Sequence, residues 1–275
     1  MSRLARALGT AAVLLLSAAL LVPAAPAGAA VADGDTVDSD PAPSWGWETV
    51  FYDAFDDPAG TPPAQWHAML GSNGAVTNGQ GQLDVGQLAQ IRTNLGWSLP
   101  TGTQVRVTAS LLMPDTGSNY AAFWVQHPNG IDPREVDVIE SYGPLKSTGA
   151  QVASHICYDD TPETAVNACA ATGRAPVMTT VSPSFPVGSE PWSAYWRYSG
   201  EFTIGGDTVT YAASDTQGNR PYEIVSGVDA RRVPGNATPF HLRLSNKDVL
   251  PQYAIPGGTR QSMLVDWVTV EVKYP

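Results

Sequence analysis

Apolar and polar residues alternate with a period of two along much of the chain, which is the pattern of a β-strand with one buried face. The segment 104–112 carries Val, Val, Ala and Leu at every second position, and the C-terminal segment 267–272 carries valine in the same way. Further runs of this kind cover residues 82–94, 120–126, 135–140, 151–158, 195–204, 208–213 and 240–245. One stretch, 162–171, has a helix-like composition instead.

Turn-forming residues separate these runs, and the chain holds 26 Gly and 23 Pro. From residue 45 to residue 275 no linker interrupts the series, so we expect a single domain over that range. Many short strands with almost no helix predict an all-β fold, a large antiparallel β-sandwich.

The N-terminus has a different character. Two arginines precede an apolar run at 7–22, and an Ala-Gly-Ala cleavage site follows at 27–29, so residues 1–29 are predicted to be a secretory signal peptide. A membrane anchor is the weaker interpretation because the run is short and ends in prolines. Residues 30–44 are small, acidic and Pro-containing, which is typical of a flexible linker. We expect a secreted, extracellular protein that has no membrane contact after cleavage.

Export changes how the two cysteines are interpreted. Cys157 and Cys169 are the only pair in the chain, and an oxidising compartment favours a disulfide between them. The loop that they close is short, so its stabilisation is expected to be about 2–3 kcal/mol. A catalytic or metal-binding thiol is the alternative, and no Cys-x-x-Cys motif supports it.

Composition and charge restrict the partners. The 43% of hydrophobic and 15% of charged residues exclude a disordered chain. With 15 Lys and Arg against 26 Asp and Glu, the formal net charge is -11, which argues against nucleic acid because phosphate binding needs clustered basic residues. Neutral ligands remain open.

The common catalytic signatures are absent from the sequence. No Gly-x-Ser-x-Gly elbow is present, which argues against a hydrolase of the α/β type. A Gly-x-Gly at 79–81 continues with Asp84, so the dinucleotide-binding fingerprint fails. The four histidines are scattered without the spacing of a zinc site.

One predicted strand carries three carboxylates within six residues, Glu135, Asp137 and Glu140. Strict alternation puts the first two on one face and Glu140 on the other. A β-bulge at Val138–Ile139 would return Glu140 to the shared face, and bulges are over-represented next to active sites. The alternative is a solvated acidic face with no chemistry.

Paired carboxylates on one rigid surface are what glycoside hydrolysis uses, one as nucleophile and one as proton donor. The Asp between them would share a proton with the nucleophile and separate the pKa values of the carboxyl groups. Aromatic side chains add to this interpretation, because Tyr142 and Trp192 are candidates for stacking on sugar rings, although core packing is the plainer role for each.

These residues resemble glycoside hydrolase family 16 over nearly the whole mature domain. The resemblance is carried by the opening 51–56 with Trp66, the apolar strand 120–125, the motif 135–140 and the closing segment 261–270. It implies a concanavalin-like jelly roll of two curved antiparallel sheets, with a cleft across the concave one.

The resemblance also implies roles. Glu135 would be the nucleophile, Asp137 the assisting residue and Glu140 the general acid/base, while Trp124 and His155 would line the cleft. The chain departs from the family at Tyr120-Ala121, where Trp-Pro is frequent, and at Ala54, where Glu is frequent. Some relatives bind a structural calcium near the chain ends, where Asp266 stands here. We assign no metal and expect no cofactor to be required for catalysis.

The expected function is therefore a secreted, endo-acting, retaining β-glycosidase that acts as a monomer on a polysaccharide. The bulged six-residue motif argues against the lichenase and xyloglucan branches, which leaves an endo-β-1,3-glucanase ahead of an agarase-like endo-β-galactanase. A lectin-like binding module would be expected to lose one glutamate, and a polysaccharide lyase would need an Arg/His/Tyr set.

Overall fold

The computed structural model describes residues 46–69, 74–115, 119–127, 135–141, 152–158, 177–181, 185, 188–206, 208–216, 222–229, 238–248 and 260–275, and for 153, 155–158, 177–181, 222–229 and 248 the backbone alone. All of them belong to one unit, Asp35–Pro275. The predicted signal peptide, most of the linker and the helix-like stretch 162–171 lie outside the described residues. Within that description no helix has the length and apolarity to cross a membrane.

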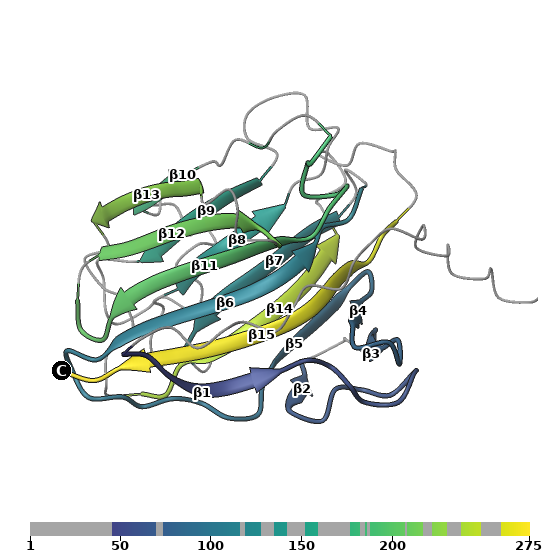
Figure 1. The fold of residues 1–275 in the computed structure, drawn as a ribbon, viewed down its shortest axis with the longest axis horizontal. Helices are drawn as coiled ribbons and strands as arrows, with labels where there is room; N and C mark the ends of the chain where they lie inside the picture. Colours follow the sequence, from purple (N-terminus) through teal and green to yellow (C-terminus); the bar gives the residue numbers. More distant parts are fainter. Residues whose placement is uncertain are drawn as a thin grey trace, which may run out of the picture. The chain divides into compact units, whose positions relative to one another are not determined.

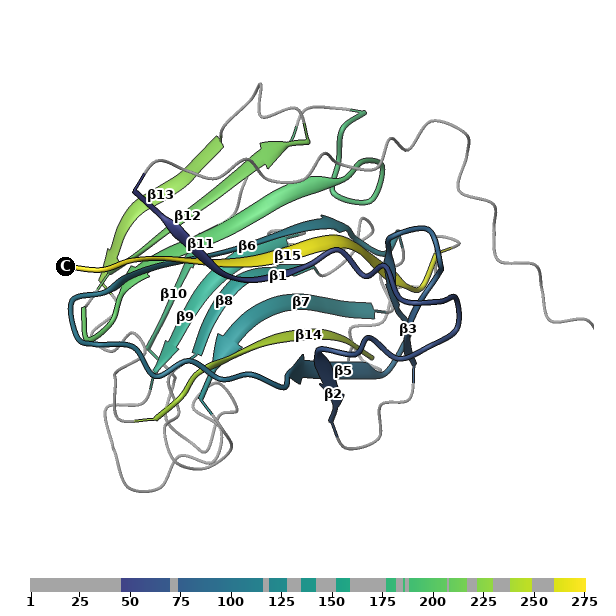
Figure 2. The ribbon, with the colours of Figure 1, turned by 60° about the horizontal axis from the view of Figure 1, so that its bottom comes forward.

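The described strands form two antiparallel sheets, shown as two layers in Figures 1 and 2. The eight-stranded sheet has the order β13-β12-β11-β6-β15-β4-β3, with β1 paired to β15. Its strands are β1 (Glu48–Asp53), β3 (Ala75–Thr77), β4 (Leu83–Val85), β6 (Gln104–Leu112), β11 (Trp196–Thr203), β12 (Thr208–Asp215), β13 (Tyr222–Asp229) and β15 (Met263–Lys273).

The seven-stranded sheet has the order β10-β9-β8-β7-β14-β5-β2. Its strands are β2 (Trp66–Ala68), β5 (Ala89–Thr93), β7 (Asn119–Gln126), β8 (Glu135–Ser141), β9 (Val152–Tyr158), β10 (Val177–Val181) and β14 (His241–Asp248). The predicted all-β jelly-roll sandwich of two antiparallel sheets is confirmed.

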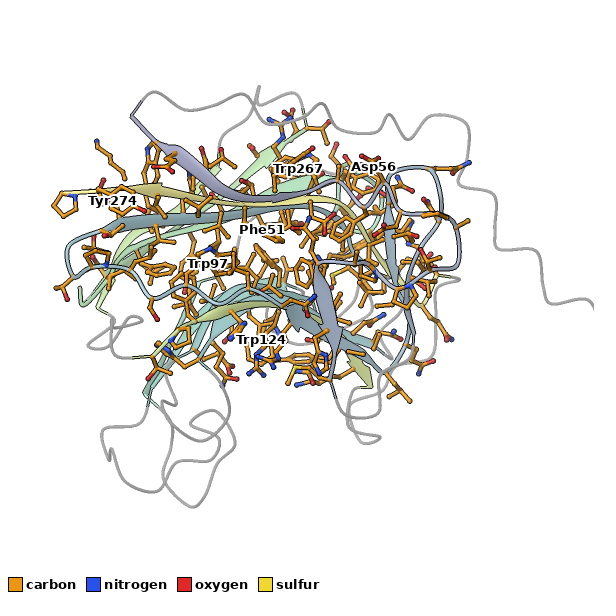
Figure 3. All side chains as sticks on the ribbon, turned by 90° about the horizontal axis from the view of Figure 1, so that it is seen from below. Phe51, Asp56, Trp97, Trp124, Trp267 and Tyr274 are labelled. Carbon is orange, nitrogen blue, oxygen red and sulfur yellow. The ribbon has the colours of Figure 1, made fainter. Side chains whose placement is uncertain are left out.

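The hydrophobic core lies between the two sheets. Apolar side chains of both sheets form one buried cluster, in which Phe51 of β1 meets Trp97 edge-on with ring centroids 5.5 Å apart. The valines at every second position of β6 and β15 belong to this cluster, as their alternation predicted. Figure 3 shows Phe51 and Trp97 between the layers and Trp124 on the opposite side of the seven-stranded sheet.

One predicted strand is wrong. The segment 82–94 was expected to be one run with a period of two, yet the chain leaves one sheet after Val85 and joins the other at Ala89, so that β4 and β5 belong to different layers. Leu88, which is 57% exposed, takes a positive φ of 68° in this crossing, and its N–H donates to Asn246 of β14. The core residues on both sides of the crossing, Leu83 and Val85 before it and Ala89 and Ile91 after it, all have odd numbers because both strands face the same core.

Five strands were not predicted from the sequence. They are β1, β2, β3, β10 and β13, which lie at or next to the sheet edges or span only three residues. β2 and β3 span three residues each, which is too short for a period of two to be recognised.

A glycine of the eight-stranded sheet accommodates the carboxylate-bearing strand. A Cβ built on Gly200 of β11 would lie 3.2 Å from Cγ2 of Val138 in β8 and 3.9 Å from the Tyr211 ring. Val138 is buried in the core, so the absence of a side chain at 200 gives room for β8 at its centre.

We therefore predict that Gly200→Val lowers the free energy of unfolding by about 1–3 kcal/mol, the usual range for overpacking a core. Chemical denaturation of the two proteins measures the difference. A second change, Val138→Ala, should restore part of the loss because it empties the same space. Equal stability of Gly200→Val and the parent protein would contradict this account of the packing.

Candidate active site

A β-bulge in β8 sets the direction of the three carboxylates. Phe123 of β7 pairs with Ile139 while the next residue, Trp124, pairs with Asp137, so Val138 is an extra residue on β8. The pairing with β9 shifts at the same place, and the Ser154 hydroxyl donates to the Val138 carbonyl over 2.6 Å. The bulge lies where the spacing of the motif required it.

The extra residue gives β8 two faces with distinct roles. Val136, Val138 and Ile139 belong to the core cluster between the sheets. Glu135, Asp137 and Glu140 alternate with them and share the outer face. The sheet is bowed, and Trp124 beside Asp137 lies on its concave side (Figure 3).

The carboxylates are packed closely enough to change one another's ionisation. Asp137 is 3% exposed and Glu140 is 7% exposed, while Glu135 is partly exposed. Burial, followed by repulsion from Glu140, raises the pKa of Glu135 to about 7, while its hydrogen bond with Asp137 works against the rise. Burial, then repulsion from Glu135 and Glu140, raises the pKa of Asp137 well above its usual range. Asp137 is therefore the carboxyl group that stays protonated, and its O–H donates a hydrogen bond to Glu135.

Strand β7 supplies polar partners for both glutamates. Gln126 donates from Nε2 to Oε2 of Glu135 over 2.9 Å. The Tyr120 hydroxyl donates to Oε1 of Glu140 in a short hydrogen bond. Each glutamate thus has a side-chain donor that orients it from the neighbouring strand.

Trp124 separates the carboxylates from a basic region on β14. Its indole N–H donates to the Ser245 hydroxyl over 3.2 Å. The Arg243 guanidinium carbon lies 4.6 Å from the ring centroid and Lys247 Nζ lies 5.5 Å from it, both within the range of cation–π attraction. Arg243 and Lys247 also act on Glu135, whose pKa they lower against the larger effect of burial.

A neutral histidine holds the next basic side chain. His241 Nδ1 lies 3.0 Å from the Thr93 carbonyl, which only accepts, so Nδ1 carries the proton. Nε2 then accepts from Nη1 of Arg92 over 3.3 Å. Burial, together with Arg92 and Arg243, lowers the pKa of His241. A Cβ at Gly96 would come within 2.8 Å of this ring, so only glycine leaves room for it.

The predicted binding residues are placed unevenly. Trp124 lies beside Asp137, and the backbone of His155 pairs with Asp137 from the other neighbour, β9, although its side chain lies outside the description. Tyr142 also lies outside the described residues. The described contacts of Trp192 join its carbonyl to Arg260, at 2.5 Å, and not to the carboxylates. Its role in substrate binding stays a prediction.

The predicted disulfide falls outside what the structure describes, because Cys169 lies in 159–176 and only the backbone of Cys157 is described. For a metal, no group of three or more His, Cys, Asp or Glu side chains suited to an ion occurs among the residues that the structure describes. Asp53, next to Ala54, accepts from the Phe55 N–H and from the Trp66 indole N–H, each over 2.9 Å. The carboxylate of Asp53 is thus used in the fold.

The fold of this chain is one that known structures share. No protein-family model matches the sequence, and no curated protein matches it significantly. Among solved structures, an endo-1,3-β-glucanase from Streptomyces sioyaensis is similar with a TM-score of 0.58 and 20% identity, over 86% of this chain and 100% of that one. The chain has the fold of family 16 glycoside hydrolases.

Two further structures agree with this fold. A glycosyl hydrolase family 16 protein from Mycobacterium smegmatis has a TM-score of 0.54 and 19% identity, over 81% of this chain and 100% of that one. The laminarinase from Rhodothermus marinus has a TM-score of 0.56 and 18% identity, over 82% and 97%. At these identities the likeness concerns the fold.

Sequence reasoning missed Tyr120 and Gln126 as partners of the glutamates and missed the basic side chains on β5 and β14. A signal for the second group was present. In β14, His241, Arg243, Ser245 and Lys247 alternate with two leucines, so the strand has a strongly polar outer face although it lies in the middle of a sheet. Such a face is unusual unless something binds to it.

The raised pKa of Glu135 has a measurable effect on stability. Since the pKa is higher in the folded protein, about 7, than the ordinary 4.5, folding favours the protonated form, and stability is lost as the pH rises through this window. Glu135→Gln is neutral at every pH. We predict that it melts at nearly the same temperature as the parent at pH 4 and several degrees higher at pH 8.

Differential scanning calorimetry at the two pH values tests this, with the exposed Glu48→Gln as the matched control. The control removes a carboxylate from the first residue of β1, in the other sheet, and should leave the difference between the two pH values unchanged. A Glu135→Gln protein that is less stable than the parent at pH 8 would contradict the assigned cause.

Proposed function

We propose that this protein is an endo-acting β-glycosidase that cleaves a polysaccharide with retention of anomeric configuration. The observation that carries the proposal is the bulge in β8, which gathers Glu135, Asp137 and Glu140 on one concave face beside an aromatic ring. Two carboxyl groups close together on a rigid surface are the arrangement of the retaining mechanism. The shared fold with family 16 glycoside hydrolases supports the same reaction.

Glu135 is the nucleophile in this mechanism. It attacks the anomeric carbon in its ionised form, which requires a donor that stabilises negative charge after the sugar has displaced water. Asp137 serves this purpose because it stays protonated and donates a hydrogen bond to Glu135, and Gln126 donates a second one. As the glycosyl–enzyme bond forms, the negative charge on Glu135 is neutralised, and Glu140 becomes the charged carboxylate because it has given its proton to the leaving group.

Glu140 is the general acid/base. It gives its proton to the departing glycosidic oxygen in the first step and takes a proton from water in the second, in which water breaks the glycosyl–enzyme bond. The Tyr120 hydroxyl, which donates to Oε1, orients the carboxyl group for these transfers.

The backbone linkage proposed first is that of a β-1,3-linked glucan. The similar solved structures include an endo-1,3-β-glucanase and a laminarinase, which supports this linkage. The second candidate is a β-galactan such as agarose, since Tyr120 and Ala121 stand where glucan-cleaving relatives carry Trp-Pro. A polymer that lies across an open sheet face is cut internally, whereas an enclosed pocket would select chain ends. We propose that the enzyme is secreted and monomeric.

A lectin-like module remains as the second function class. A binding protein on this fold has no need for a bulge that brings three repelling carboxylates together at the cost of raised pKa values. The retention of all three residues supports the enzyme.

Removal of the nucleophile is the first test. Glu135→Ala is expected to release no reducing ends from laminarin or agarose, while circular dichroism shows an unchanged fold because an outer-face carboxylate holds no core together. In the parent protein, kcat/KM should fall as the pH drops below about 7, where Glu135 takes up a proton. Proton NMR of early products should show the β-anomer first. Activity of Glu135→Ala within tenfold of the parent, or an α-anomer, would end the assignment.

The acid/base role of Glu140 gives a second test. Glu140→Gln cannot protonate a poor leaving group, so we predict a loss of about 10²–10⁴-fold on the polysaccharide. An aryl glycoside with a good leaving group needs no such proton, and its first step should remain close to the parent rate. Stopped-flow measurement of the aryl release separates that step. Equal losses on both substrates would exclude the role.

A further inference from the structure

The outer face of the seven-stranded sheet carries basic side chains that the mechanism above does not use. Arg92, Arg243 and Lys247, here called the basic cluster, lie on the side of Trp124 opposite to Asp137. Arg92 of β5 pairs with Arg243 of β14, which pairs with Trp124 of β7, which in turn pairs with Asp137 of β8. At a spacing of about 4.8 Å between strands, the Cα of Arg92 lies roughly 14 Å from that of Asp137.

The direction of these side chains follows from the alternation of their strands. Ile91, Leu242 and Leu244 belong to the core between the sheets, so Arg92, Arg243 and Lys247 point to the concave outer face. Arg243 is 3% exposed beneath the others, whereas Arg92 is partly exposed and Lys247 is exposed. The cluster is accessible through Arg92 and Lys247. A sugar chain that crosses the strands past the carboxylates would pass over it.

The basic side chains of the cluster lie close enough together to repel one another. Arg92 and Arg243 occupy directly paired positions, where like charges destabilise a sheet. Within the part of the chain that the structure describes, Arg92 and Lys247 form no ion pair with a carboxylate. Burial lowers the pKa of Arg243 to about 10, together with the charge of Arg92, while the charge of Glu135 acts in the opposite direction. Among the described residues, the positive charges of Arg92 and Lys247 are thus not balanced by a paired carboxylate.

Arg92 is also held in a fixed position. Nε2 of the neutral His241 ring accepts a hydrogen bond from Arg92 Nη1, Nδ1 donates to the Thr93 carbonyl, and Gly96 leaves the space for the ring. An arginine that only improves solubility would not need a buried histidine to orient it. The planar fork of a guanidinium fits a sulfate or a carboxylate better than a sugar hydroxyl.

We propose that the substrate is an anionic polysaccharide, whose sulfate or carboxylate groups are bound by Arg92 and Lys247 on the sugar units that lie beyond Trp124 from the cleavage site. This inference rests on the proposed glycosidase function and specifies its substrate class. The net charge of -11 does not oppose it, because interactions beyond about 8–10 Å are screened at physiological salt while the local field of the cluster remains.

The test uses three substrates that share one backbone: laminarin, partially sulfated laminarin and laminarin oxidised in part to carboxylates at C6. Reducing ends are measured over a range of concentrations to obtain kcat and KM. We expect at least one charged form to have a KM about tenfold below that of laminarin at low salt, and this advantage to disappear in about 0.5 M NaCl. The form that responds identifies sulfate or carboxylate as the anion.

Variants separate binding of the anion from general effects. Arg92→Gln should raise KM for the charged substrate about five- to tenfold and change KM for laminarin less than about twofold, with kcat little affected on both. Arg92→Lys should recover part of the loss because it restores the charge without the fork. Arg106→Gln is the matched control, since Arg106 lies on the other sheet, where it pairs with Glu271 over 2.9 Å.

The outcomes are distinguishable. Laminarin cleaved with a KM equal to or below that of both charged forms, or an Arg92→Gln defect of equal size on all three, would overturn the inference and leave the glycosidase proposal intact. If no polymer is cleaved, the glycosidase proposal fails instead. In that case calorimetric titration of the protein and of Arg92→Gln with oligosaccharides from the three substrates still decides whether the face prefers anions.

Discussion

The parity of side chains along β8 is the constraint on which the rest of the site depends. A regular strand cannot place residues 135, 137 and 140 on one face, because 140 differs from the others by an odd number. The extra residue Val138 changes the parity, and the core accepts the change because both Val138 and Ile139 are apolar. Gly200 of the opposite sheet leaves the space that the widened strand occupies. The chemistry on one face is thus tied to the packing on the other.

Electrostatics across the concave face follow from this geometry. The bulge forces three carboxyl groups into a small, poorly hydrated area, and two features of the fold reduce the unfavourable electrostatic energy. Asp137 gives up its charge, because burial and two neighbouring anions favour its protonated form. Arg243 and Lys247 act on Glu135 from beyond Trp124 and reduce the effect of burial on its pKa. An acidic half and a basic half therefore lie on one surface, separated by a single indole ring.

Such a surface lowers the stability of the folded protein, and its presence despite this loss argues for a function. Paired guanidinium groups, a buried histidine fixed in one tautomer and carboxyl groups with raised pKa values all weaken the free energy of folding relative to an apolar or neutral face. None of them is needed to join the two sheets, whose contact consists of aromatic and aliphatic side chains. Natural proteins keep local conflicts of this kind mainly where they bind or react.

The sequence by itself determined the all-β class, most central strands and the three carboxylates with the bulge between them, because these depend on local alternation and on spacing within one strand. It did not determine the break at 86–88, where both flanking strands face one core, nor the strands at the sheet edges. The partners Tyr120 and Gln126 and the basic cluster come from strands far apart in the chain. Only the pairing of β5, β14, β7 and β8 places them together, since register is a property of the assembled sheet.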